Sequence, residues 1–151
     1  IIPSAGIGAL DMLSASSIGV LKEVNMVIRK NTEAWIGTVA ENKFDLTTYN
    51  DNLILFTGTV REGAKLYPQN VNISASVALA GIGLDKTNLK IISDSSINTH
   101  IISINAKGDF GEFNFEENVI PSEENEKTGK IVSLAIIKTL KNLTSNLIIG
   151  L

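Results

Sequence analysis

The chain has 151 residues, of which 44% are hydrophobic and 19% are charged, and its mean hydropathy is +0.19. This composition predicts one ordered domain with its own core, and the net charge of −3 argues against a nucleic-acid-binding surface. The absence of cysteine and the single histidine exclude disulfides and cysteine- or histidine-rich metal sites. No apolar run has the length of a membrane span, so we expect a cytoplasmic protein without a membrane or metal as partner.

The first third of the chain predicts a helix, two strands and a long polar connection. Ser4 is the expected N-cap of a helix that runs to about Ser16. Residues 22–30 alternate in polarity but carry apolar side chains on both faces, which predicts a strand inside a sheet. Residues 32–50 predict a loop with a helical turn, and the apolar run at 53–56 predicts a short strand.

The middle of the chain predicts two short helices. Thr59 and Glu62 have the spacing of a capping box, so a helix is expected to begin there and to end before Pro68. A second helix over 72–80 is rich in small residues, which allow its backbone to pack closely on a sheet. Gly81 should end this helix.

The second half of the chain predicts most of the sheet and a closing helix. A tight turn at 107–109 should join the last two strands as a hairpin. Helical periodicity is strongest over 128–143, where the apolar surface is wider than one packing partner requires. Residues 147–149 should form a short strand or a tail. Three strands are expected here, at 89–93, 99–106 and 110–116. Together these elements predict an α+β domain with a mixed, largely antiparallel sheet.

Two rare residue types are candidates for chemistry. His100, the only histidine, could be a structural hydrogen-bonding residue, but histidine is also the usual acid or base near neutral pH. Arg61, one of two arginines, could be solvated on a helix or could clamp a carboxylate. The glycine pairs at 6–8 and 81–83 do not complete a dinucleotide-binding fingerprint. These residues alone indicate an α+β domain without identifying its function.

Several stretches together resemble one family. They are IIPSAGIGALDML, LFTGTVREGAKLYPQNVNISASVALAGIGLDKT, GDFGEF and NVIPSEENEKTG. In order and spacing they resemble the patterns PSGAIxGLD, FxGxAxEAxxxFPxNVN, LAGIGxDxT, GxFGxF and NxPSPENPKTS of the carboxyl-terminal part of L-aspartate dehydrogenases. The resemblance covers almost the whole chain. Each match is weak alone, but five ordered matches are specific together.

The resemblance implies that residues 1–151 form one substrate-binding and dimerisation domain, with a mixed sheet covered by helices. This fold resembles the carboxyl-terminal domain of glyceraldehyde-3-phosphate dehydrogenase. Family members also carry an amino-terminal Rossmann domain, which is absent here, so the fragment alone should be inactive. The implied reaction is the NAD- or NADP-dependent oxidation of L-aspartate to iminoaspartate. That product hydrolyses to oxaloacetate and ammonia, or feeds NAD biosynthesis.

The absence of the Rossmann domain also leads to an expectation about how this chain associates with other copies. A homodimer is expected from the resemblance. Without its Rossmann-domain partner, the apolar face of the helix at 128–143 should be exposed, swapped or paired with another copy.

The resemblance also places family contacts on individual residues of this chain. Cofactor contacts fall on Gly6, through its backbone, and on Asn72. The lysine of the family's last motif falls on Lys127. We expect either Lys127 or Arg61 to hold a substrate carboxylate.

The catalytic histidine of the family is assigned to His100, as the acid or base of the reaction. An alignment without gaps instead puts Ile102 at the histidine position and His100 two residues earlier. Side chains at i and i+2 lie on the same face of a strand, so both can face one cleft. Either a register shift restores His100 to the catalytic place, or the histidine is displaced and the activity is weakened or altered.

Two other functions remain open from the sequence. The chain could belong to a related amino- or keto-acid dehydrogenase with a different substrate, for which a displaced histidine would be the marker. It could also be a non-catalytic dimerisation or binding module in which Ile102 has replaced the working residue.

Overall fold

The computed structural model describes residues 2–4, 7–46, 52–123 and 128–150, so the predicted site residues Gly6 and Lys127 lie outside the described residues. Eleven elements follow one another within these described residues. They are α1 (Leu10–Ser16), β1 (Leu21–Lys30), the 3₁₀ helix η1 (Thr32–Trp35), α2 (Val39–Lys43), β2 (Leu53–Thr59), α3 (Val60–Leu66), α4 (Asn72–Ala80), β3 (Asn88–Ser93), β4 (His100–Gly108), β5 (Gly111–Val119) and α5 (Ile131–Thr144).

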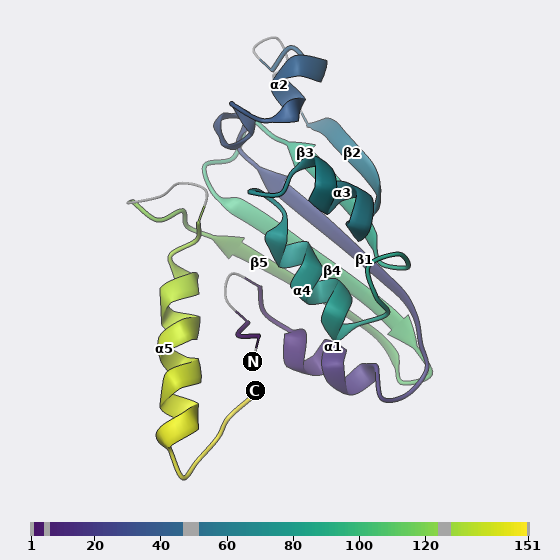
Figure 1. Cartoon of the computed structure of the whole chain (residues 1–151), viewed down its shortest axis with the longest axis vertical. Helices are drawn as coiled ribbons and strands as arrows, with labels where there is room; N and C mark the ends of the chain where they lie inside the picture. The colour runs from purple at the N-terminus through teal and green to yellow at the C-terminus, as the bar shows by residue number, and fades with distance from the viewer. Residues whose placement is uncertain (1, 5–6, 47–51, 124–127, 151) are drawn as a thin grey trace.

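A five-stranded sheet in the order β2-β3-β1-β4-β5 forms the centre of the domain (Figure 1). β1 is the middle strand, and it pairs in parallel with β3 and antiparallel with β4. The outer pairs, β2 with β3 and β4 with β5, are both antiparallel. The structure therefore confirms the predicted α+β class, the mixed and largely antiparallel sheet, and the interior position of the strand at 22–30.

The helices α1, α3 and α4 lie over one face of this sheet, and the core lies between the two layers (Figure 1). α4 approaches the sheet closely because Ser74 and Ala78 on its inner side are small and fully buried. Trp35 and Tyr67 meet edge to face, with ring centroids 5.8 Å apart, and both are buried in the same core. The strands contribute alternate side chains to this core, among them Val24, Met26, Ile28, Leu89, Ile91, Ile102, Ile104 and Ala106.

The opposite face of the sheet carries polar side chains from the intervening positions. Four asparagines lie in register across neighbouring strands, in the order Asn88, Asn25, Asn105 and Asn114. The Asn88 amide donates to Asn25 at 2.8 Å, and the Asn105 amide donates to Asn114 at 2.8 Å. The alternation of the strands thus separates an apolar face from a hydrogen-bonded polar face.

The prediction of a helix beginning after Ser4 is wrong, because α1 begins only at Leu10. The backbone N–H of Ile7 donates to the Ser4 carbonyl in a turn, and Ile7 is buried in the core. Ala9, at the N-cap position, has a φ of 60°. This left-handed conformation interrupts the chain before the helix, so burial of Ile7 overrides the capping signal at Ser4.

The helix predicted at 128–143 also begins later, at Ile131. Gly129 forms an isolated antiparallel bridge with Pro121, and the Thr128 carbonyl accepts a hydrogen bond from the Ser122 N–H. These residues therefore pair with the segment after β5 instead of starting the helix. The hairpin turn falls slightly later than predicted, at Asp109 and Phe110, because β4 continues to Gly108.

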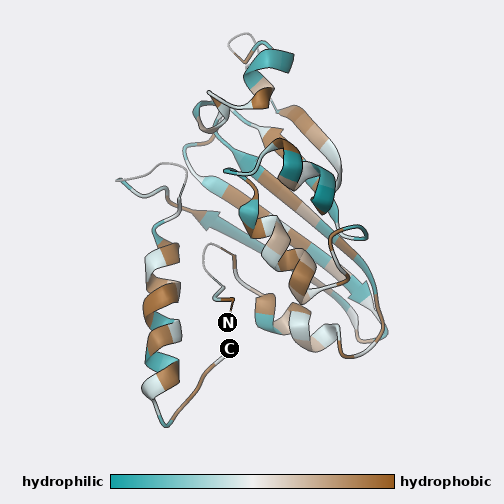
Figure 2. Ribbon diagram, in the orientation of Figure 1, coloured by the Kyte–Doolittle hydropathy of each residue, from teal (hydrophilic) through white to brown (hydrophobic). Residues whose placement is uncertain are grey.

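α5 stands beside the two layers instead of lying on the sheet, and apolar residues recur along its length (Figure 2). Ala135 is its buried residue, whereas Leu134, Ile137 and Leu140 are each 60% exposed. This confirms that the apolar face of the helix is exposed in this chain. Within the described part of the chain, no helix combines the length and apolarity that crossing a membrane requires.

The capping box predicted at the start of α3 is present. The Thr59 hydroxyl accepts from the Glu62 N–H, and the Glu62 carboxylate accepts from the Thr59 N–H at 2.9 Å. Thr59 is also the last residue of β2, so the cap joins a strand directly to a helix.

We expect Thr59→Ala to lower the free energy of unfolding by about 1 kcal/mol, because it removes the acceptor for the helix N-terminus. Urea denaturation of the protein measures this change. Thr59→Ser keeps the hydroxyl and is the matched control. Equal losses in both variants would show that the threonine methyl group, and not the cap, is responsible.

Candidate functional site

A pocket of about 230 Å³ lies where the end of β1, the start of β4 and the start of α4 meet. Thr128 and Gly129, which come just before the N-cap residue of α5, and Val132 of its first turn also line the pocket. Its size is below the range of about 300–1,000 Å³ that is typical for drug-sized ligands, so it suits a small metabolite. The lining residues are Lys30, Gln69, Asn70, Asn72, Ile73, His100, Ile102, Val119, Thr128, Gly129 and Val132.

His100 is the first residue of β4 and is only 5% exposed. Ile102 follows on the same face of the strand, and both side chains line the pocket. The expectation that the two residues face one cleft is therefore confirmed. His100 also lines a second hollow of about 180 Å³, together with Glu33 and Asn98. The histidine therefore borders two separate hollows.

The pocket brings His100 together with Asn72, the predicted cofactor contact. Asn72 is the first residue of α4, it is exposed, and its side-chain carbonyl accepts the Ile73 N–H at 2.9 Å. Asn70 nearby is different, since it is buried and its amide donates to the Ala34 carbonyl at 2.7 Å. Asn70 therefore holds the loop between α3 and α4 in place, whereas the amide of Asn72 is accessible at the pocket.

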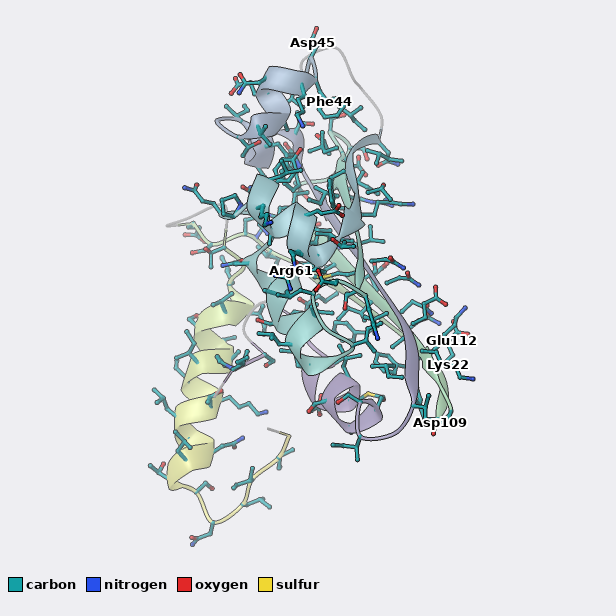
Figure 3. The ribbon with its side chains drawn as sticks, turned by 45° about the vertical axis from the view of Figure 1, so that its right-hand side comes forward. Lys22, Phe44, Asp45, Arg61, Asp109 and Glu112 are labelled. Carbon is teal, nitrogen blue, oxygen red and sulfur yellow. The ribbon has the colours of Figure 1, made fainter. Side chains whose placement is uncertain are left out.

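Arg61 is not brought to this pocket. It lies on α3 (Figure 3), where its guanidinium forms two hydrogen bonds to Asp85, at 2.5 and 2.9 Å. The hydrogen bonds from Arg61 lower the pKa of the Asp85 carboxyl below its usual range. Both side chains are solvent-exposed, so the pair is a surface ion pair. Lys127 and Gly6 lie outside the described residues, but Thr128, the next residue after Lys127, lines the pocket.

Lys30 is a pocket residue that the sequence analysis missed. It ends β1, it is 3% exposed, and its Nζ donates to the Asn70 carbonyl at 3.3 Å. A signal was present in the sequence, because Lys30 continues the alternation of Val24, Met26 and Ile28. A lysine at a position that alternates with the apolar residues of a strand face is expected to be buried. Lysines are seldom fully buried unless they are paired.

Glu117 on β5 is a second missed residue. It pairs with Ile102 across the strands and follows Phe113 and Phe115 in the alternation, so it belongs to the core-facing side. Burial raises the pKa of its carboxyl, and a hydrogen bond from the Gly8 backbone partly opposes that shift. One of its carboxylate oxygens is buried without a hydrogen-bond partner among the described residues.

Comparison with known proteins gives a consistent result. The sequence matches the family described as "Aspartate dehydrogenase, C-terminal" over residues 11–143. The L-aspartate dehydrogenase of Cupriavidus necator is 39% identical over 92% of this chain and 52% of that protein. The L-aspartate dehydrogenase of Pseudomonas aeruginosa is 37% identical over 94% of this chain and 53% of its own length.

A solved structure of the same family is also similar to this chain. The crystal structure of aspartate dehydrogenase from Thermotoga maritima superposes with a TM-score of 0.74 at 25% identity. The match covers 99% of this chain and 55% of that one. The chain therefore spans about half the length of the relatives to which it is similar.

The raised pKa of Glu117 gives a pH-dependent prediction. Because the folded state binds this proton more tightly than the unfolded state, stability should fall as the pH rises from about 4.5 through the raised folded pKa. Glu117→Gln is uncharged at every pH and keeps an acceptor for the Gly8 N–H. We therefore expect the variant to gain stability relative to the wild type as the pH increases.

The urea midpoints of wild type and Glu117→Gln, measured between pH 4 and pH 8, test this expectation. Glu116→Gln is the control, since Glu116 is an exposed neighbour whose carboxylate accepts from the Ser103 hydroxyl. A difference between Glu117→Gln and wild type that does not change with pH would contradict the prediction.

Proposed function

This chain belongs to the family of aspartate dehydrogenase C-terminal domains, and we propose that it is the substrate-binding half of an NAD- or NADP-dependent L-aspartate dehydrogenase. The reaction would oxidise L-aspartate to iminoaspartate, which water converts to oxaloacetate and ammonia. The observation that carries the proposal is the burial of His100, the chain's only histidine, beside Asn72 in a pocket of metabolite size.

His100 is proposed as the acid and base of this reaction. The substrate amine must lose a proton before the Cα–H bond can break, and a base must later deprotonate the water that attacks the imine. An imidazole can perform both transfers near neutral pH. Because His100 is only 5% exposed, its ring is largely shielded from bulk water.

The residues described at the start of α4 fit the nicotinamide end of a cofactor. Asn72 presents an exposed primary amide at the pocket, and such an amide can pair with the carboxamide of nicotinamide. We assign cofactor contact to Asn72, and to Gly6 through its backbone. When bound, the cofactor supplies the hydride acceptor, while residues of this chain hold and orient the substrate.

One substrate carboxylate is assigned to Lys127 in preference to Arg61. The chain runs directly from Lys127 into Thr128, which lines the pocket, whereas Arg61 is engaged by Asp85 on α3. A guanidinium in a two-bond ion pair with a carboxylate is already matched to its partner. Arg61 therefore needs a rearrangement before it could bind substrate.

The whole protein is proposed to carry an amino-terminal Rossmann domain and to form a homodimer. The relatives are about twice as long as this chain, and α5 exposes an apolar face that suits packing against further structure. A cytoplasmic location and a supply of iminoaspartate to NAD biosynthesis complete the proposal, and these two points rest on the family resemblance.

The His100 assignment is tested by His100→Asn in the full-length protein. Asparagine is similar in size but does not exchange protons near neutral pH, so kcat should fall about 10²- to 10⁴-fold. Reduced-cofactor absorbance and released ammonia measure turnover. Ser103→Ala, on the other face of β4, is the control and should leave kcat unchanged.

The same assay separates the competing functions. If the wild-type protein oxidises a different amino acid but not aspartate, the substrate is that amino acid and the aspartate assignment is wrong. A protein that reduces no cofactor with any amino acid would be a binding module. If aspartate is oxidised and His100→Asn is as fast as wild type, the histidine is not the acid or base.

Asn72→Ala should raise the KM for the cofactor about 3- to 10-fold, because it removes one amide hydrogen bond. The KM for aspartate should change less. Asn72 is exposed, so thermal stability should be nearly unchanged. Initial rates with each substrate varied in turn measure the effect, and Asn114→Ala on the polar sheet face is the control. If the KM for aspartate rises more than the KM for the cofactor, Asn72 contacts the substrate instead of the cofactor.

A further inference from the structure

His100 lies between two hollows at one end of the sheet. One is the proposed substrate pocket of about 230 Å³, and the other is the second hollow of about 180 Å³, which Glu33 and Asn98 help to line. Among the described residues that line them, His100 is the one common to both. A molecule that reacts beside this imidazole in the pocket therefore has a second compartment on the other side of the ring.

The second hollow offers hydrogen-bond acceptors to a small cation. Glu33 contributes a carboxylate, Asn98 a side-chain carbonyl and Thr99 a hydroxyl oxygen. No lysine or arginine is found among the described residues that line it. Glu33 and Asn98 are exposed, Thr99 is half-buried and His100 is buried. The hollow therefore extends from the surface to the imidazole.

The walls of the second hollow are held by side-chain hydrogen bonds. The Asn31 amide donates to the Ile97 carbonyl at 2.6 Å, and its side-chain oxygen accepts the Glu33 N–H at 3.0 Å. One asparagine thus joins the start of η1 to the segment that leads into β4. The Asn70 amide donates to the Ala34 carbonyl, which ties η1 to the loop beside the pocket. The acceptors of the hollow are therefore carried by mutually braced segments.

The proposed reaction produces a small cation next to His100. When the imine of aspartate is protonated on nitrogen, hydrolysis consumes one water molecule. The water gives its oxygen to the reacting carbon and its two hydrogens to the nitrogen, with the imidazole as proton carrier. The C–N bond then breaks, and the nitrogen leaves as ammonium. Atoms and charge balance without any further reactant.

We propose that the second hollow is the ammonium subsite of the enzyme. Ammonium leaves the reacting carbon past His100 into this hollow, and it enters by the same route when the reaction runs towards aspartate. The inference rests on the proposed function, and it assigns the recognition of ammonium to Glu33 and Thr99. An ammonium ion has only N–H donors, so a carboxylate and a hydroxyl oxygen are suitable partners. The dicarboxylate and the cation then leave on different sides of the histidine.

The KM for ammonium in reductive amination tests this assignment. The full-length protein receives saturating oxaloacetate and reduced cofactor, and ammonium chloride is varied. Glu33→Gln removes the charge and keeps the shape of the side chain, so the KM for ammonium should rise about 2- to 5-fold, as for an exposed charge pair. Thr99→Val removes one hydroxyl and should raise it about 2- to 10-fold. The KM for oxaloacetate should change less in both variants.

Glu41→Gln is the matched control. Glu41 is an exposed glutamate on α2 that does not line the hollow, and its substitution changes the net charge by the same amount. All rates are compared at one ionic strength, because salt screens surface charges. The proposal is overturned if Glu33→Gln and Thr99→Val both have the ammonium KM of Glu41→Gln. A rise in the KM for oxaloacetate alone would overturn it as well.

Binding of ammonium can also be followed without turnover. In the full-length protein with ¹³C-labelled histidine, the Cε1–H signal of His100 is identified by its loss in His100→Asn. Ammonium chloride should shift this signal to saturation, and Glu33→Gln should require about 2- to 5-fold more ammonium. Potassium chloride, whose cation is of similar size, is the reference. An equal response to potassium would show an adventitious ion only and would overturn the proposal.

The two measurements separate this inference from the proposed function. If ammonium shifts the His100 signal in a manner that depends on Glu33, but the wild type does not oxidise aspartate, the ammonium site stands and the dehydrogenase proposal fails. If the wild type oxidises aspartate, but neither the ammonium KM nor the His100 signal depends on Glu33 or Thr99, the dehydrogenase proposal stands and the ammonium subsite is wrong.

Discussion

The antiparallel pairing of β1 with β4 is the constraint on which the rest of this domain depends. It places Ile28 opposite Ile102, and two strand faces with the same alternation then form one continuous apolar surface. A slip of one residue would turn every core side chain of one strand to the polar face. The same register carries Lys30 and His100 to one edge of the sheet, so the core and the site are fixed by a single set of backbone hydrogen bonds.

The helix layer completes what the sheet begins. α4 can approach the strands because Ser74 and Ala78 are small, and this close packing brings its first residue, Asn72, to the edge where β1 ends and β4 starts. The bridge between Pro121 and Gly129 holds Gly129 at the pocket before α5 begins. The pocket is therefore a meeting point of segments that lie far apart in the sequence.

Two features of the domain depart from the usual pattern of apolar residues inside and charged residues outside. α5 exposes leucines and isoleucines to solvent, and Glu117 places a carboxylate among the aromatic side chains of β5. Glu117 accepts a hydrogen bond from the Gly8 backbone in the N-terminal segment, and α5 stands beside the two layers (Figure 1). Exposed apolar surface and a half-buried carboxylate are both costs for an isolated chain, and both can be offset by contact with further structure.

The sequence by itself determined the class of the domain, most of its elements and the family to which it belongs. Alternation within 22–30 identified an interior strand, and the Thr59–Glu62 spacing identified a helix start, because both signals depend on neighbouring residues alone. Tertiary structure decided the start of α1, where burial of Ile7 outweighed a capping signal, and it decided that Arg61 faces Asp85 rather than the pocket. It also brought Lys30 beside His100. Seventy residues separate these two in the chain, and only the register of a long-range strand pair can set their distance.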